Sequence, residues 1–351
     1  MAVVPAAGNH INGQGMKTGI KTQVSLKDIA RKTGLSTPTI SQILNGKTTN
    51  FSSDATKARV FEAARELGYR PNFGYKVMRG QATKTVSLVV SLQRVLEENY
   101  IQELILRLMA ELDRRGYGTY ISTFALSPEE NIDKVKVLMS RGAESFVFLG
   151  TPVGHLGIRE LLRSHGKAYI GYGSDFERDV TPDTTYGFEA ILRHFLGRGR
   201  KNIKLIMTDE PKRFQGLRNV FPGVSDDELK ARHLVEFALP QYSAWTHMET
   251  CFNIGHEMTR QALDMGKDVD ALIYLSDIFA VGGVKFLLDN NYRVGSDIAV
   301  AGHNYTDMVK YSPYPISSVE HDAAATTAAL MENFAGVEPM VTLVKPIVHI
   351  R

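Results

Sequence analysis

The chain has 351 residues, with 43% hydrophobic and 23% charged residues. That length suits two to three domains, and the balanced composition argues against global disorder or a fibrous repeat. No stretch approaches the roughly 20 apolar residues that span a bilayer. The single cysteine excludes an internal disulfide framework and a Cys-based zinc finger. The apolar run at residues 2–7 is too short for a signal peptide, so a cytoplasmic protein is expected.

The net charge of +3 conceals an asymmetry along the chain. Residues 1–84 carry 13 Lys+Arg against 4 Asp+Glu, a balance of +9, and the remainder carries 28 against 34, a balance of −6. A basic first quarter on an acidic body is typical of a chain whose N-terminal part binds an anionic partner. A solvated basic face would have the same composition, so the pattern inside the segment must decide.

Three short helices are expected after a polar, glycine-rich tail at residues 1–23, which is predicted to be disordered. Ser25 and Ser53 are placed to cap the N-terminal ends of the first and third helices, and either Ser36 or Thr37 caps the second. Gly34 and Gly68 follow the first and third, where glycine commonly ends a helix. Apolar residues recur at helical spacing between these signals, which predicts a small domain over residues 24–70.

From residue 85 onward, apolar runs alternate with amphipathic segments. Strands are expected at 86–92, 118–123, 145–150, 168–171, 203–207, 232–237, 271–275 and 298–302. Helices are expected at 101–115, 128–141, 156–165, 186–197, 214–220, 246–265 and 279–290. This alternation predicts parallel sheets with helices on both faces, and about eight such units favour two similar lobes. The acidic residues Asp175, Glu177, Asp179 and Asp183 are expected in a loop, with solvated carboxylates.

The most specific motif is 24-VSLKDIARKTGLSTPTISQILNG-46. Two helices joined by a tight glycine-containing turn match a helix-turn-helix, whose second helix lies in the DNA major groove. An ordinary helical hairpin is the alternative, but the basic charge of this segment favours DNA binding.

This motif, together with 52-SSDATKARVFEAARELGYRPN-72, resembles the headpiece of LacI-type (LacI/GalR) bacterial transcription repressors. The resemblance continues through the core to the final strands. It implies an α/β core of two doubly wound parallel-sheet lobes, similar to a periplasmic binding protein, that dimerises and binds a small effector between its lobes. It divides the chain into a helix-turn-helix domain (24–70), a hinge (71–84) and a core (85–351). Within the core, lobe one is expected at about 85–179 plus 322–340, and lobe two at about 180–321 plus 341–351.

In the second helix, the resemblance assigns base reading to Thr37, Pro38 and Gln42. The family commonly has arginine at the third position. Glutamine suits adenine, whereas arginine pairs with guanine, so the DNA site is expected to depart from the usual one. Four further residues are expected to contact phosphates, or only to cap helices: Ser25, Ser36, Thr39 and Asn45.

The hinge of the family contains a helix that inserts an apolar side chain into the minor groove. Here that position is Met78, flanked by Lys76 and Arg79, which are expected to meet phosphates. A plain linker without a wedge is the alternative.

The effector site is assigned mainly from the resemblance. Arg213 matches an arginine that holds effector hydroxyls or carboxylates, and Ser276-Asp277 follow a strand at the edge where such sheets bind ligands, with Asp277 also a possible helix N-cap. Asn304 and His321 replace an aspartate and a glutamine that are common in the family. The remaining candidates are Asn99 and Tyr100, expected in the loop after the first core strand, and Phe237 and Trp245 as stacking faces.

Catalytic motifs are not found. There is no HExxH sequence and no phosphate loop, and the ten histidines lack metal-ligand spacing, so neither an enzyme nor a cofactor is expected. The sequence therefore predicts a homodimeric, DNA-binding repressor of a carbohydrate operon, controlled by a sugar-like effector. The alternatives are a sugar-binding transport or sensor protein of the same core fold, and a doubly wound enzyme.

Overall fold

The computed structural model describes residues 24–45, 52–69, 74, 77, 82–91, 99–208, 210–237, 248–266 and 268–351. The chain divides into two compact units, residues 1–76 and residues 77–351. Within the described ranges, no helix is both long and apolar enough to cross a membrane.

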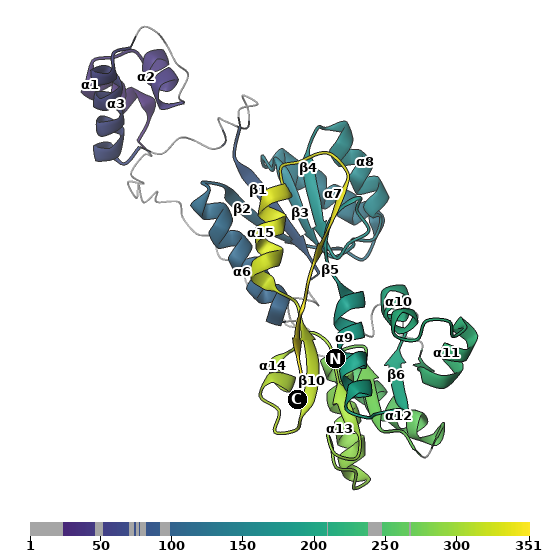
Figure 1. The fold of residues 1–351 in the computed structure, drawn as a ribbon. Helices are drawn as coiled ribbons and strands as arrows, with labels where there is room; N and C mark the ends of the chain where they lie inside the picture. Colours follow the sequence, from purple (N-terminus) through teal and green to yellow (C-terminus); the bar gives the residue numbers. More distant parts are fainter. Residues whose placement is uncertain are drawn as a thin grey trace, which may run out of the picture. The chain divides into compact units, whose positions relative to one another are not determined.

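The first unit is a three-helix domain (Figure 1). Its helices are α1 (Leu26–Thr33), α2 (Thr37–Leu44) and α3 (Asp54–Leu67). One small apolar core joins all three and consists of Ile29, Ile40, Ile43, Val60, Ala63 and Ala64. The three helices expected from the sequence are thus confirmed.

The ends of these helices follow from local chemistry. Ser53 accepts a hydrogen bond from the Thr56 N–H and starts α3. Gly34 and Gly68 end α1 and α3 with φ values of 69° and 67°, a left-handed conformation that glycine adopts at little cost. Gly34 also forms the tight turn that carries the chain from α1 into α2.

The second unit contains two six-stranded sheets. The first has the order β11-β5-β4-β3-β1-β2 and is parallel throughout. Its strands are β1 (Thr85–Val90), β2 (Gly118–Thr123), β3 (Ser145–Leu149), β4 (Ala168–Tyr172), β5 (Arg178–Pro182) and β11 (Met340–Val344).

The second sheet has the order β12-β10-β9-β8-β6-β7, and only the β10–β12 pair is antiparallel. Its strands are β6 (Ile203–Met207), β7 (Leu234–Glu236), β8 (Ala271–Tyr274), β9 (Ala299–Ala301), β10 (Ile316–Glu320) and β12 (Ile347–His349). Two parallel-sheet lobes are therefore confirmed. The first and second lobes are named below by these sheets.

Helices cover both faces of each sheet, and an apolar core lies between each face and the helices that pack on it. On the first sheet, α6 (Asn99–Arg114) and α15 (Ala323–Asn333) share one core and lie side by side in Figure 1. The other face carries α7 (Pro128–Ser140) and α8 (His155–Ser164). The second lobe holds α9 (Thr184–Gly197), α10 (Pro211–Val220), α11 (Asp226–His233), α12 (Met248–Asp264), α13 (Asp277–Asp289) and α14 (Asp307–Lys310).

The lobe boundaries differ from the expected ones. The chain crosses between the sheets after β5, after β10 and after β11. Residues 180–182 and 342–344, which were expected in the second lobe, pair with each other in the first sheet instead. The crossing points therefore lie near residues 183, 321 and 345.

The expectation of a solvated acidic loop is wrong for Asp179, which lies in β5, whereas Asp175 is exposed in the loop before this strand. Asp179 is 3% exposed, and its Oδ1 accepts hydrogen bonds from the Ser174 N–H (3.0 Å) and the Ser174 hydroxyl (2.6 Å). Glu177 accepts hydrogen bonds from Arg163 and Tyr169. Burial raises the pKa of Asp179 to about 7, against the hydrogen bonds from Ser174 and the charge of Lys212.

Two other expectations require correction. The segment expected as a strand from residue 232 begins instead with the end of α11, and only residues 234–236 form β7. Asn99 and Tyr100 do not lie in a loop but begin α6. Cys251 is buried in α12.

Candidate nucleic-acid interface and effector site

The outer face of α2 carries the residues expected to read bases. Ile40 and Ile43 are buried against α1 and α3, so the opposite face of α2 is left outward. Pro38 and Gln42 lie four residues apart on that exposed face, and Thr37 at the N-terminus is half-buried. A helix that buries one face against its neighbours and exposes a polar side chain such as Gln42 on the other has an arrangement suited to a recognition helix.

The residues expected to contact phosphates also form hydrogen bonds at the ends of α1 and α2. The Ser36 hydroxyl accepts a hydrogen bond from the Thr39 N–H at 3.3 Å, and the two hydroxyls lie 2.8 Å apart. The Asn45 amide donates to the Ser41 carbonyl at 2.7 Å. The backbone N–H of Ser25 donates to the Asp28 carboxylate at 2.9 Å. The capping role is therefore observed for this group, and a phosphate contact remains a proposal.

Four expected residues lie outside the described part of the chain. These are Lys76, Met78 and Arg79 of the hinge, and Trp245 of the effector site.

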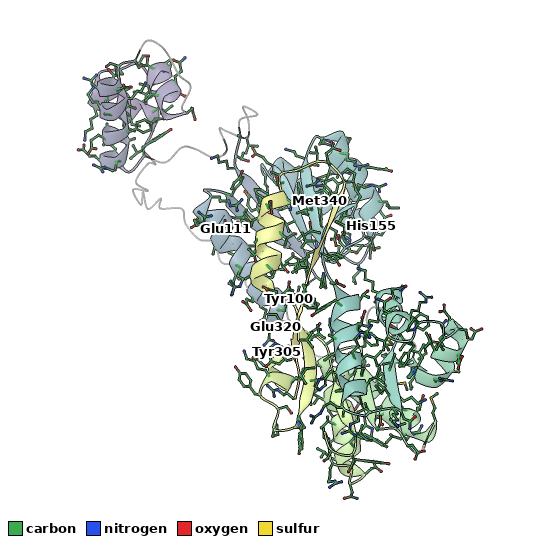
Figure 2. The ribbon with its side chains drawn as sticks, viewed as in Figure 1. Tyr100, Glu111, His155, Tyr305, Glu320 and Met340 are labelled. Atoms are coloured by element: carbon green, nitrogen blue, oxygen red, sulfur yellow. The ribbon has the colours of Figure 1, made fainter. Side chains whose placement is uncertain are left out.

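A row of rings connects the first lobe to the chain crossing after β10. The rings of Tyr100 and Tyr172 are 5.7 Å apart, those of Tyr100 and His321 are 5.0 Å apart, and those of His321 and His303 are 5.0 Å apart. The Tyr100 hydroxyl donates to Thr326 of α15 at 2.9 Å. Figure 2 shows Tyr100 near the strand that carries Glu320. Tyr100 and His321 therefore lie together.

Asn304 belongs to the same cluster. Its side-chain oxygen lies 3.2 Å from Nε2 of His321. Its φ of 94° and that of Tyr305, 44°, place this turn in a strained region for residues other than glycine. The turn presents Asn304 beyond the carboxyl end of β9, the edge at which open α/β sheets bind ligands.

Asp277 fixes that turn rather than facing a ligand. It is fully buried, and its carboxylate accepts hydrogen bonds from the Thr306 N–H (2.6 Å), the Thr306 hydroxyl (3.0 Å) and the Ser318 hydroxyl (2.7 Å). Burial raises its pKa to about 7, despite these bonds. The expected N-cap role of Asp277 is wrong, because Ser276 occupies the N-cap position and Asp277 is the first residue of α13.

Arg213 is the third residue of α10, a helix that starts three residues earlier than expected. Its side chain is 6% exposed, and its Nη1 donates to the carbonyl of Tyr274, at the end of β8, over 3.4 Å. Burial lowers its pKa to about 10, so the guanidinium stays charged at neutral pH.

His303 is a member of the site that sequence reasoning missed. It is 7% exposed, its ring meets that of His321, and the charge of Arg213 acts on it. Burial and these two neighbours hold the pKa of His303 well below its usual range, so the ring is neutral at pH 7. Its position directly before Asn304, after a buried strand, was the available signal.

Other expected residues lie apart from this cluster or contribute differently. Asn99 is exposed at the start of α6. Phe237 packs against Phe279 in the apolar core of the second lobe, with ring centroids 5.4 Å apart. Ser276 is half-buried beside Asp277 at the end of β8. In the described ranges, no group of three or more His, Cys, Asp or Glu residues could hold a metal ion.

Comparison with known proteins agrees with this geometry. The family "Bacterial regulatory proteins, lacI family" matches residues 25–72, and the family "Periplasmic binding protein-like domain" matches residues 192–336. Among curated relatives, the HTH-type transcriptional repressor PurR of Haemophilus influenzae is 22% identical over 306 residues, which are 84% of this chain and 85% of the relative. The HTH-type transcriptional regulator MalR of Clostridium butyricum is 23% identical and covers 85% and 88%.

Solved structures show the same fold. The Lac repressor dimer bound to operator and the anti-inducer ONPF superimposes with a TM-score of 0.69 at 16% identity, over 93% of this chain and 98% of that one. The transcriptional regulator CelR in complex with cellobiose gives a TM-score of 0.60 at 21% identity, over 94% and 99%. This chain thus joins a helix-turn-helix domain that matches the lacI family of bacterial regulatory proteins to a core that matches the periplasmic binding protein-like family.

Proposed function

We propose that this protein is a sequence-specific, DNA-binding transcriptional regulator that represses a carbohydrate-utilisation operon. A small, sugar-like effector bound in the core controls its affinity for operator DNA. The observation that carries the proposal is that one chain combines two features. The face of α2 that carries Gln42 is exposed, and the core buries an arginine, Arg213, with only one long hydrogen bond to the described residues. The proposal includes no catalytic step, and it places the protein with the DNA in the cytoplasm.

The outer face of α2 is proposed to enter the major groove. Thr37, Pro38 and Gln42 would reach base edges, with the amide of Gln42 suited to an adenine. Ser25, Ser36, Thr39 and Asn45 would add contacts to phosphates, which fix the register of the helix on the duplex. In the hinge, Met78 is proposed as a minor-groove wedge, with Lys76 and Arg79 at flanking phosphates.

The protein is proposed to act as a homodimer, because one helix-turn-helix reads only half of a symmetric site. The first lobe offers a suitable surface. Its edge strand β2 exposes Ile121, and the adjoining α6 exposes Leu106 and Met109. Exposed apolar side chains beside an unpaired strand edge favour association with a second copy.

The effector is proposed to contact Arg213, Asn304, His321 and Tyr100. These residues come from both lobes and from the crossing between them, so a bound effector would bias the arrangement of the lobes. The headpiece is joined to the core through residues 71–84, so a change in the lobes would alter the spacing of two headpieces in a dimer. Coupling of this kind is reciprocal, since DNA must change effector affinity by the same factor.

A sugar-binding transport or sensor protein with the same core fold is the second candidate. It is favoured by the core alone. The helix-turn-helix domain, with its polar outward face, opposes it.

Selection of the full chain on randomised duplex DNA tests the proposal. A regulator should enrich a site with two-fold symmetry. Gln42→Glu should abolish the enrichment, since the added charge faces the DNA. The matched change Gln215→Glu, on an exposed face of α10, should leave it intact. A selection without any enriched sequence would leave the sugar-binding candidate in its place.

A further inference from the structure

Tyr305, the residue after Asn304, is held by side chains that follow from the last strand of the second sheet. Its ring stacks on that of His349 in β12, with ring centroids 3.6 Å apart and planes inclined by 2°. The guanidinium of Arg351 lies 5.9 Å from the centre of the Tyr305 ring and donates to its hydroxyl at 3.3 Å. Residues far away in the sequence therefore fix this side chain.

The two residues that hold Tyr305 are themselves anchored in the second lobe. His349 lies in the strand that pairs with β10, and its Nε2 is 2.5 Å from the Glu320 carboxylate. Arg351 donates to the carbonyl of Lys310 in α14 at 2.8 Å. Figure 2 labels Tyr305 and Glu320, the two residues that His349 joins. The ring of His349 thus cannot leave Tyr305 without breaking a second contact.

The backbone at this turn needs such support. Asn304 and Tyr305 have φ values of 94° and 44°, which residues with a side chain adopt only where surrounding contacts hold them. Their N–H groups donate to the Val319 carbonyl (2.8 Å) and the Ser318 hydroxyl (3.0 Å) of β10. A turn that relaxed to negative φ would rotate the Asn304 side chain away from its present direction.

We propose that His349 is a positioning residue for effector binding, which keeps the strained turn folded by stacking on Tyr305. The amide of Asn304 then stays beside His321, whose Nε2 lies 3.2 Å from its oxygen. The inference rests on the function proposed above and adds a residue that does not touch the ligand.

The ring contact carries this role, and the ion pair is secondary. The side chains of His349 and Glu320 are 28% and 37% exposed, and an ion pair at such a surface contributes little by itself. The stack, by contrast, acts directly on the residue whose backbone is strained. Glu320 serves to orient the imidazole.

Hydrogen exchange of the full chain without ligand tests the inference. In the wild type the N–H groups of residues 304–306 are all hydrogen-bonded and should exchange slowly. In His349→Ala, peptides that cover these residues should exchange at rates that approach those of unprotected amides. Peptides that cover β8 should keep their wild-type rates, because the effect is confined to the turn.

Matched variants separate the ring from the ion pair. His349→Phe keeps a ring on Tyr305 and should exchange like the wild type, whereas His349→Gln keeps a donor to Glu320 without a ring and should exchange like His349→Ala. Tyr305→Leu removes the stack from its other side, should also expose the turn, and replaces His349→Ala if that variant does not fold.

A histidine elsewhere in the same lobe gives the control. His256 likewise contacts a ring, that of Phe286 at 5.1 Å, and lies 3.9 Å from the carboxylate of Asp289. His256→Ala should leave exchange at residues 304–306 unchanged.

Ligand affinity gives the second readout. Ribose, fructose, glucose and cellobiose, with ribose 5-phosphate and glucose 6-phosphate, are screened by thermal shift, and calorimetry measures each one that binds. His349→Ala should weaken binding by roughly tenfold or more, because apparent affinity falls with the population of the competent turn. His349→Phe should bind like the wild type.

Unchanged exchange at residues 304–306 in His349→Ala would overturn the inference. Faster exchange throughout the second lobe would do so as well, because His349 would then be a general stabiliser. Loss of protection with wild-type ligand affinity would show that the turn does not position the ligand. If no member of the panel binds the wild type, the proposed sugar-like effector is wrong, whereas exchange at the turn still supports or overturns the role of His349.

Discussion

Gln42 is the residue whose chemistry most directly sets the DNA sequence. It lies on the exposed face of α2, four residues after Pro38. We predict that Gln42→Arg shifts the preferred base at one symmetric position of each half-site from adenine to guanine. The change in discrimination should be about 1–3 kcal/mol, since arginine forms a bidentate pair with guanine. Sequencing of selected DNA measures it, and an unchanged consensus would mean that residue 42 does not face bases.

Asp179 predicts a dependence of stability on pH. The folded protein holds its proton up to a pKa of about 7, whereas an unfolded chain releases it near 3.8. The folded state therefore binds more protons between pH 4 and 7, and the free energy of unfolding should fall as the pH rises through this window.

Asp179→Asn tests that prediction. The amide oxygen can still accept both hydrogen bonds from Ser174, but the group no longer ionises. Urea unfolding at several pH values should show a smaller decline from pH 4 to 7 in the variant than in the wild type. Asp133→Asn, at an exposed site of α7, should leave the wild-type decline unchanged. A variant that declines as steeply as the wild type would contradict the assignment.

At the scale of whole elements, the local signals in the sequence were sufficient to predict the three helices of the helix-turn-helix domain. Serine caps and terminating glycines act within a few residues, so Ser53 and Gly68 define α3 without reference to the rest of the fold. Buried parallel strands such as β3 were equally clear, because both faces are apolar.

Elements that depend on distant partners could not be predicted. β5 begins Arg178-Asp179 and ends in proline, so it lacks the pattern of a buried strand. Arg178 is nevertheless 3% exposed, because it donates to the carbonyl of Tyr169 on the neighbouring strand β4 and to that of Asn333, 155 residues away. The effector cluster likewise depends on contacts between residues that are far apart in the sequence. Arg213 and His321 were assigned from the family resemblance, Tyr100 from its place after the first core strand, and His303 became visible only through its ring contact with His321.

The exposed face of β2 and α6 predicts the dimer contact. Leu106 and Ile121 are 67% and 51% exposed, beside the unpaired edge of β2. We predict that Leu106→Glu weakens the dimer and lowers operator affinity at least tenfold at nanomolar protein, since a charge would be buried at the contact. Analytical ultracentrifugation and DNA titration measure both effects. Leu156→Glu, on the similarly exposed α8, is the control that should change neither.

If the Leu106 variant stays dimeric, this face is not the contact. A monomeric variant that still binds the full symmetric site with wild-type affinity would contradict the need for a dimer.

At the scale of the whole molecule, the charge asymmetry predicts a strong effect of salt. Residues 1–84 carry a balance of +9 and the rest of the chain −6. Basic groups that neutralise phosphates release counterions, so operator affinity should fall by roughly 10³-fold or more between about 50 and 200 mM salt. Fluorescence anisotropy over this range measures the slope. A chain that begins at residue 85 should not bind the operator at any salt, and binding by that chain would place the interface in the core.

Effector control of DNA binding is the central claim, and one titration tests it most directly. The affinity of the full chain for its selected operator is measured without ligand and with a saturating sugar or sugar derivative that a thermal-shift screen shows to bind the core. We predict a change of about 5–150-fold, and the same factor when the effector is titrated into the chain with and without operator. Arg213→Gln should bind operator normally and show no change. An operator affinity that stays constant while the core is saturated with ligand would contradict the account.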